Sequence, residues 1–318
     1  MKLFSRLVLM ATVAVACVSF SFSQTASPES QISEFDVNGM KVLIKRPAGT
    51  PTVAAGLFFR GGVRNMTAEN AGIEGFMLSA ATESSKNFPL QTLRKETSKI
   101  GTAIGSSSTY DYSVLSMAST KPNFEKSWQM FVDVAINPTF APDVVERTRE
   151  GILTGLRTQA DSPEGSLEQS VEKVVYAGHP YAVGPEGTIE IISKLTPADL
   201  AAYHKKLLQT SRMLLVVVGD IEPLTLQKKI AASFAGLPRG DYKYDPLPPI
   251  KFGEASVDIT TKSVQTDYVK GTFLAPSLSD PDYFAMRTAI SILQSRVYQE
   301  VRVKRNLSYA PDAELYGL

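Results

Sequence analysis

The chain has 318 residues, of which 43% are hydrophobic, and this apolar content excludes a disordered or low-complexity protein. It carries 33 basic and 32 acidic residues, so its net charge gives no sign of a nucleic acid or an anionic membrane surface as a partner. Its one cysteine, Cys17, excludes a disulfide framework and a multi-cysteine metal site. The two histidines, His179 and His204, leave little for histidine-based metal chemistry. The length suggests about two domains.

Residues 1–23 have the pattern of a secretory signal peptide. Two basic residues precede an apolar run at 7–18, which is shorter than the roughly 20 residues of a membrane-spanning helix. Small residues follow, as signal peptidases require. We therefore expect export to a bacterial periplasm and no membrane segment in the mature chain. The alternatives are a lipoprotein attached through Cys17 and a buried N-terminal helix. Residues 24–31 are expected to form a polar linker.

Hydrophobic periodicity and turn residues predict the elements of a first αβ domain, 32–237. Asn38-Gly39 favours positive φ and predicts a hairpin between two strands. In the strand 110–119, the alternation of side chains leads us to expect a buried face with Tyr110, Tyr112 and Val114. The strands are predicted over 32–37, 40–45, 52–59, 102–108, 110–119 and 213–218. The helices are predicted over 68–84, 90–99, 124–136, 143–157, 167–176, 197–207 and 224–234.

A proline-rich segment at 238–250 predicts a linker and a domain boundary. After it, strands are expected over 255–260 and 264–274, and a long amphipathic helix over 283–302. The second half therefore begins as the first did, with strands followed by a helix. This order indicates the α+β class and a duplicated unit.

Several stretches, in their order along the chain, resemble the pitrilysin/insulinase family of zinc metallopeptidases, which includes mitochondrial processing peptidase. These stretches are Phe59–Arg64, Asn70–Ile73, His179–Tyr181 with Gly187-Thr188, Leu195–Leu200 and Met213–Asp220. The resemblance implies tandem two-layer metallopeptidase-like αβ units, each with an antiparallel-rich mixed sheet covered by helices. It also leads us to expect that the second unit, 251–318, is truncated, because it is too short for a full sheet and its helices.

The zinc site of this family lies in an H-x-x-E-H helix, in which two histidines bind the ion and the glutamate serves as the general base. In this sequence Gly75 stands for the first histidine, Leu78 for the glutamate and Ser79 for the second histidine. The downstream glutamate ligand aligns with Gly155, or alternatively with Glu150. Glycine and leucine offer no ligand atom, so the resemblance implies no metal site and no cofactor in this chain.

Many bacterial relatives pair a zinc-bearing chain with a chain that lacks the motif and contributes an Arg–Tyr pair. Residues 301–309 resemble the corresponding "R-x-K-x-G-L-x-Y" segment, with Arg302 and Tyr309 at its spacing and Asn306 in place of the glycine. A guanidinium and a phenol can donate hydrogen bonds to the oxygen of a scissile carbonyl as it gains negative charge. The alternative is an ordinary basic end of a helix.

The resemblance also implies an edge strand that binds an extended substrate peptide through backbone hydrogen bonds. The aligned strand is 102–108, and its candidate peptide-binding residues are Ile104, Gly105, Ser106 and Ser107. The alternative is a strand that only completes the sheet.

The leading hypothesis is a non-catalytic partner subunit of a zinc-dependent peptide-degrading complex. Its expected partners are a homologous subunit with the zinc motif, which holds the Zn²⁺, and a peptide substrate. The alternative is a peptide-binding or assembly protein with no role in catalysis. A third hypothesis, an active enzyme with its own metal, predicts stoichiometric zinc in the pure chain. His179 and His204 are expected to be structural or solvated.

Overall fold

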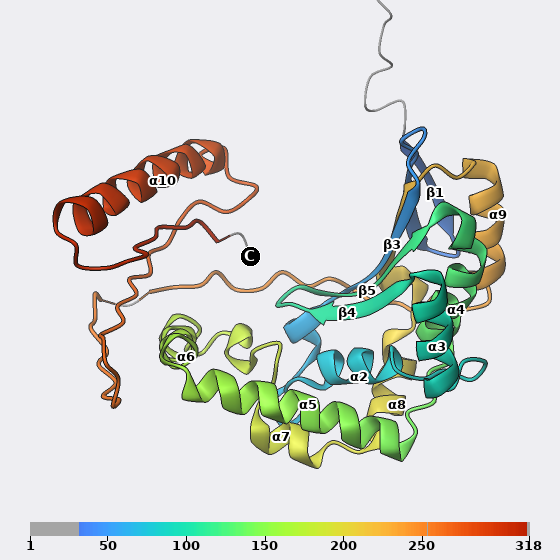
Figure 1. Cartoon of the computed structure of the whole chain (residues 1–318), viewed down its shortest axis with the longest axis horizontal. Coiled ribbons are helices and arrows are strands. Elements are labelled where there is room, and N and C mark those ends of the chain that lie inside the picture. Colours follow the sequence, from blue (N-terminus) through green and yellow to red (C-terminus); the bar gives the residue numbers. More distant parts are fainter. Residues whose placement is uncertain (1–31, 253, 317–318) are drawn as a thin grey trace, which may run out of the picture.

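A six-stranded mixed sheet forms the centre of the fold, with the strand order β1-β2-β6-β3-β5-β4 (Figure 1). The computed structural model describes residues 32–252 and 254–316, so the predicted signal peptide, Cys17 and residues 24–31 lie outside the described residues. Strands β2 and β6 pair in parallel, and the other neighbours are antiparallel. The strands are β1 (Ile32–Val37), β2 (Met40–Lys45), β3 (Thr52–Arg60), β4 (Ala103–Ser108), β5 (Tyr112–Thr120) and β6 (Met213–Gly219).

Helices cover one face of this sheet, which confirms the predicted α+β class. The helices before the proline-rich segment are α2 (Ile73–Ala81), α3 (Leu90–Ile100), α4 (Phe124–Ile136), α5 (Pro142–Asp161), α6 (Pro163–Val175), α7 (Ile189–Lys194), α8 (Pro197–Leu207) and α9 (Pro223–Phe234). Short 3-10 turns lie at Gly62–Asn65, Ala68–Asn70, Lys121–Asn123, Pro180–Val183 and Thr210–Arg212. Within residues 32–252 and 254–316, no helix has both the length and the apolar character needed to cross a membrane.

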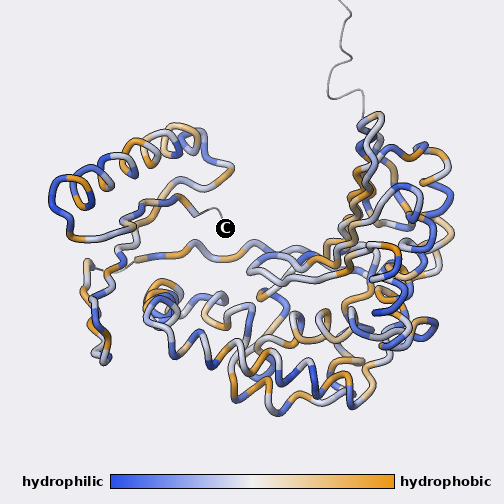
Figure 2. Tube along the Cα trace, viewed as in Figure 1, coloured by the Kyte–Doolittle hydropathy of each residue, from blue (hydrophilic) through white to orange (hydrophobic). Residues whose placement is uncertain are grey.

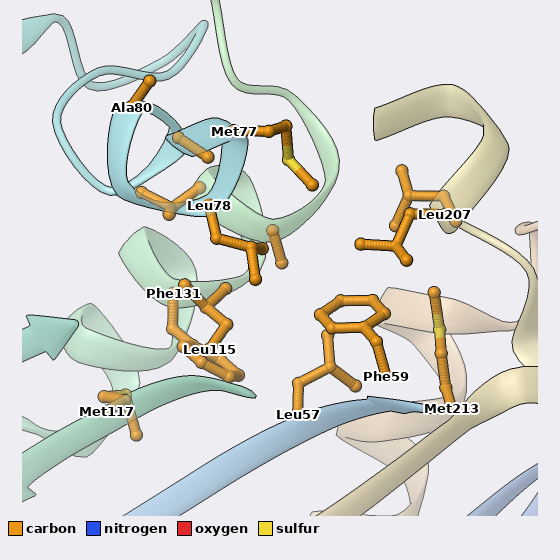
Figure 3. Close-up of a cluster of buried hydrophobic side chains, with 14 of the residues drawn as sticks. Leu57, Phe59, Met77, Leu78, Ala80, Leu115, Met117, Phe131, Leu207 and Met213 are labelled. Atoms are coloured by element: carbon orange, nitrogen blue, oxygen red, sulfur yellow. The ribbon is translucent and has the colours of Figure 1, made fainter. Parts of the chain in front are cut away.

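The core lies between the sheet and the helices, and alternate residues of each central strand point into it. In β3 the buried positions include Leu57 and Phe59, which face Met213 of β6 and Leu207 of α8 (Figure 3). Burying a side chain of this size contributes about 1.5–3 kcal/mol relative to leaving it exposed. The helix-covered face is therefore the main source of stability and fixes which residues of β4 point toward α2.

The buried face of β5 is the opposite of the one expected from the alternation. Its buried residues are Ser113, Leu115, Met117 and Ser119. Tyr112 is 43% exposed and packs its ring 5.7 Å from Phe58 on the other face of the sheet. The prediction was wrong because it assigned the aromatic residues to the core, whereas the buried position at Ser113 is held by a hydrogen bond to a buried carboxylate.

The predicted helix 68–84 is interrupted by Gly72, so α2 begins only at residue 73. Gly72 has a φ of +82° and precedes the first turn of α2. A Cβ at this position would lie 2.7 Å from the carbonyl oxygen of Glu186 and 2.8 Å from the Cα of Gly187. Only glycine satisfies both the left-handed backbone and this close approach. The start of α2 is thereby fixed against the loop before α7.

The strands predicted over 255–260 and 264–274 are wrong, because the structure describes no strand between residues 254 and 282. A strand exists through hydrogen bonds to a neighbour, and this segment runs extended without a paired strand. Figure 2 shows apolar residues along this segment and on the helix that follows. That helix is α10 (Tyr283–Val297), continued by a π-helical turn at Tyr298–Lys304. The predicted long helix 283–302 is therefore confirmed in position and ends in a wider turn.

Candidate functional site

The candidate site lies where α2 faces the edge strand β4. Gly75 and Ser79 are one helical turn apart, so they lie on the same face of α2. A Cβ added to Gly75 would lie 3.5 Å from the Cβ of Ser108, and Ser79 lines a cavity together with Ser106. Among the strands that the structure describes, β4 pairs only with β5 and so presents its other backbone edge outward.

The face of β4 toward α2 carries its even-numbered residues. Ile104 packs against the core, and the Ser108 hydroxyl lies 2.8 Å from the Ser113 hydroxyl and donates to it, because the single proton of Ser113 is given to Glu74. Gly105 lies on the other face, and the hydroxyl of Ser116 donates to its carbonyl. Residues 104, 106 and 108 therefore point toward the helices, whereas 105 and 107 point away.

A cavity of about 350 Å³ lies between α2, α3, β4 and α5. Its polar lining includes Ser79, Glu83, Arg94, Ser106, Arg147 and Thr148. The Glu83 carboxylate accepts a 2.6 Å hydrogen bond from Nη2 of Arg94 and a 3.5 Å contact from Nη2 of Arg147. One carboxylate thus lies between two guanidinium groups, and these three charged side chains give the cavity a net positive charge.

The residues predicted to stand at the degenerate zinc positions do not fit a zinc ion. Leu78 is 3% exposed and packs in the core near Phe131 and Leu115 (Figure 3). Gly155 lies on an exposed part of α5, with no atom within 4 Å of the position of a Cβ. Among the described residues, no group of three His, Cys, Asp or Glu side chains is placed to hold a metal ion.

Glu150 lies on the opposite side of α5 from the cavity. Residues seven apart share a helix face, so Gly155 lies on the same face as Thr148, which lines the cavity. Glu150 is two residues from Thr148, about 200° around the helix, and is exposed. Its carboxylate therefore points away from the face that α5 turns toward Ser79.

A buried carboxylate, Glu74, lies directly beside Gly75, and no motif in the sequence marks it as part of the site. Glu74 has no exposed surface. Its carboxylate accepts hydrogen bonds from Ser113 Oγ at 2.5 Å, Tyr203 Oη at 2.7 Å and Asn65 Nδ2 at 3.3 Å. Burial, together with the neighbouring carboxylate, raises the pKa of Tyr203 well above its usual range. These bonds join α2 to β5, to α8 and to the turn after β3.

Arg302 and Tyr309 lie together on the surface after α10. The Cζ of Arg302 is 4.8 Å from the centre of the Tyr309 ring, and its Nη1 donates a 2.6 Å hydrogen bond to Oδ1 of Asn306. Tyr309 is 82% exposed. A guanidinium and a phenol at this separation can both reach one oxygen atom of a ligand.

Both histidines have structural contacts. His204 is 9% exposed, and its Nε2 is 2.9 Å from the carbonyl oxygen of Ala135 at the end of α4. His179 caps the turn at 180–183 by accepting a hydrogen bond from the amide of Tyr181, and its Nε2 is 3.0 Å from the carbonyl oxygen of Pro248. The carbonyl partners make each Nε2 the protonated donor nitrogen.

Two family models match the chain. The model described as "Insulinase (Peptidase family M16)" matches residues 41–188, and the model described as "Peptidase M16 inactive domain" matches residues 194–317. The first covers α2, β4, α5 and the cavity between them, and the second covers β6, α10 and the Arg302–Tyr309 pair.

Curated relatives are similar to this chain at low identity. "Cytochrome b-c1 complex subunit 1, mitochondrial" of Bos taurus is 26% identical over 84% of this chain and 55% of its own length. "Mitochondrial-processing peptidase subunit beta" of Blastocladiella emersonii is 23% identical over 84% of this chain and 57% of its own length. The chain thus spans about half the length of these relatives.

Solved structures share the fold. The structure described as "peptidase M16 inactive domain from Pseudomonas fluorescens" matches with a TM-score of 0.72 and 23% identity, over 88% of this chain and 69% of that one. The periplasmic protease PqqL from Escherichia coli matches with a TM-score of 0.62 and 19% identity, over 70% of this chain and 25% of that one. Because the two matching models describe one family and follow each other along the chain from residue 41 to residue 317, the chain belongs to the insulinase family, peptidase family M16.

Proposed function

We propose that this chain is the non-catalytic partner subunit of a peptide-degrading complex, in which a homologous subunit with the zinc motif performs the hydrolysis. The observation that carries this proposal is the contrast between two sites. The zinc positions hold Gly75, Leu78, Ser79 and Gly155, which lack suitable ligand atoms. Arg302 and Tyr309 nevertheless lie together, with the guanidinium over the ring.

The chemistry proposed for this pair is stabilisation of a developing oxyanion. Arg302 and Tyr309 would donate hydrogen bonds to the scissile carbonyl oxygen of a peptide bound at the partner's zinc site. Preorganised donors of this kind act where charge appears in the transition state, and losing one costs about 10²–10³-fold in rate. The exposure of Tyr309 supports the proposal, because core packing does not account for its position.

The proposed route of substrate binding is addition of an extended peptide to β4. The outer backbone edge of Ile104–Ser107 would pair with the peptide main chain, so recognition would depend little on the peptide's sequence. The position of β4 at the end of the sheet, next to the positively charged cavity, supports this role.

We also propose export to a bacterial periplasm, with residues 1–23 as the signal peptide. The apolar run at 7–18 supports export, as does the fold shared with a protease described as periplasmic. The lipoprotein alternative predicts a chain that is attached to a membrane through Cys17.

The test is reconstitution with a homologue that carries H-x-x-E-H. We expect the pair to cleave peptides and Arg302→Ala to lower kcat at least about 100-fold, with little change in subunit affinity. Tyr309→Phe should lower kcat by a similar amount. Arg305→Ala and Tyr316→Phe are matched controls on the same exposed segment and should leave cleavage unchanged.

The second candidate function is a peptide-binding or assembly subunit with no role in catalysis. The similarity to a relative named as a subunit of the cytochrome b-c1 complex favours this candidate. It predicts a stable complex in which neither Arg302→Ala nor Tyr309→Phe changes kcat. That result would contradict the catalytic contribution of the pair and support the assembly role.

A further inference from the structure

We propose that the cavity beside β4 binds an acidic side chain of the extended peptide, and that Arg94 and Arg147 determine this preference. This inference rests on the proposed addition of a peptide to β4. It goes further by assigning a side-chain specificity to a surface that otherwise binds only the backbone.

The charge balance of the cavity favours an anionic ligand. The cavity contains two guanidinium groups, from Arg94 and Arg147, and one carboxylate, from Glu83. Glu83 contacts one terminal nitrogen of each arginine. A guanidinium offers five N–H donors in a planar fork, so most of the donors of both groups are not used by Glu83. One further carboxylate would balance the charge.

The position and size of the cavity suit one polar side chain of a peptide bound to β4. Arg94 comes from α3, Arg147 from α5 and Ser106 from β4, so the cavity opens between the helices and the edge strand. Its volume of about 350 Å³ can hold a single side chain. The hydroxyl groups of Ser79 on α2 and Ser106 on β4 add polar atoms to the lining of the cavity and suit a polar ligand rather than an apolar one.

The alternation of side chains in a bound strand brings one peptide side chain to the cavity. Residues 104, 106 and 108 of β4 point toward the helices, and a peptide paired with β4 places every second side chain on this same face. One of these side chains lies beside Ser106 and can reach the cavity, whereas its immediate neighbours point to the opposite face. In any one register, a single peptide side chain can therefore meet the two arginines, and its immediate neighbours cannot.

The test measures binding of fluorescent nine-residue peptides to the full chain by anisotropy. A single Glu is moved along an otherwise neutral peptide, and each peptide is compared with its Gln counterpart. We expect each Glu peptide that can pair with β4 with its Glu beside Ser106 to bind about fivefold tighter than its Gln counterpart, a size set by the partial exposure of both arginines. The preference should fall in 0.5 M salt, because exposed charges are screened.

Variants of the two arginines assign the effect to the cavity. Arg94→Ala and Arg147→Ala should each remove most of the Glu preference, and Arg147→Glu should reverse it in favour of Lys. Lys95→Ala on α3 and Arg157→Ala on α5 are matched controls outside the cavity and should keep the preference. Thermal unfolding of each variant identifies any that fail to fold. If Arg147→Glu does not fold, the two alanine variants alone test the role of the cavity.

Three outcomes would overturn the inference. If Glu and Gln peptides bind equally at every position, the cavity has no charge preference, although binding to β4 stands. If the preference persists in both alanine variants, another group is responsible. If no peptide binds, both the cavity and the proposed peptide site are wrong. Failure of the catalytic proposal is separate, since it appears only as unchanged cleavage with Arg302→Ala.

Discussion

At the scale of single residues, Glu74 is the most constrained polar group near the candidate site. It has no exposed surface and receives three side-chain hydrogen bonds from three different parts of the fold. A buried carboxylate is tolerated only when hydrogen bonds compensate for its lost hydration. Glu74 therefore holds α2 in its position against β5 and α8, and with it the face that carries Gly75 and Ser79.

We expect Glu74→Ala to lower the free energy of unfolding by about 3 kcal/mol or more, because it leaves buried donors without an acceptor. Tyr203→Phe removes one donor and should cost about 1–2 kcal/mol. Urea denaturation measures both changes. Glu69→Ala, at an exposed residue in the turn before α2, is the control and should cost less than about 0.5 kcal/mol. Equal effects of Glu74→Ala and Glu69→Ala would show that the network contributes nothing.

The role of Glu74 could not be predicted from the sequence. It occurs between Ile73 and Gly75 in a short helix, where a glutamate is usually an exposed, helix-favouring residue. Its partners lie 9, 39 and 129 residues away along the chain. Local periodicity contains no information about contacts at such separations. The assignment of Gly75, Leu78 and Ser79 to the zinc positions, in contrast, is a prediction that needs only a local pattern of five residues.

At the scale of elements, propensity and periodicity succeeded where a segment has its own partner in the fold. The helices 124–136 and 197–207 have the predicted bounds, and the hairpin at Asn38-Gly39 forms with positive φ at both residues. The prediction of strands over 255–260 and 264–274 was wrong, because a strand depends on a neighbour that its own sequence does not specify. The prediction of the buried face of β5 was wrong for a related reason. Long-range contacts, and not apolarity alone, decide which side of a strand faces the core.

The contact between α8 and α4 gives a prediction about pH. His204 of α8 is buried with its Nε2 at the Ala135 carbonyl, and burial lowers its pKa below the usual value of 6.5. When the pH falls below 6.5, the unfolded chain binds a proton at this histidine that the folded chain does not. The free energy of unfolding should therefore decrease, by at most about 1.4 kcal/mol per pH unit.

Urea denaturation at several pH values between 7.5 and 5 measures this decrease. His204→Gln keeps an N–H donor for Ala135 but cannot bind a proton, so it should show a smaller loss of stability in this range. Carboxylates act in a lower range, since hydrogen bonds from Lys121 and Arg46 hold the pKa of Asp220 far below its usual value of 3.8. Identical pH profiles for the wild type and His204→Gln would contradict the prediction.

At the scale of the whole molecule, the proline-rich segment 238–250 is held against the first unit by aromatic residues. The Arg64 guanidinium lies 3.8 Å from the centre of the Tyr244 ring, and the Arg212 guanidinium lies 4.2 Å from the centre of the Tyr242 ring. The carbonyl of Pro248 accepts a hydrogen bond from His179. The path of the chain from α9 to the second half is therefore set by specific contacts.

We expect the double change Tyr242→Ala and Tyr244→Ala to release this segment. Cation–π contacts of this kind contribute about 0.5–2 kcal/mol each, so their loss should expose the backbone to proteases. Limited trypsin digestion should then cleave after Lys243 at least severalfold faster than in the wild type, as mass spectrometry of the fragments can show. Tyr268→Ala, in the following extended segment, is the control. An unchanged rate after Lys243 would mean that other contacts hold the segment.

The central position of β6 has a consequence for the order of folding. Strands β1 and β2 form a hairpin, and β3, β5 and β4 form a second antiparallel group, and in the sheet of the described residues β6 lies between these two groups. Residue 213 follows the end of β3 by more than 150 positions, so neither group can join the other until most of the chain has emerged from the ribosome. Non-local pairings of this kind fold slowly. Under the proposed export, a long period without a complete sheet would keep the chain unfolded for translocation across a membrane.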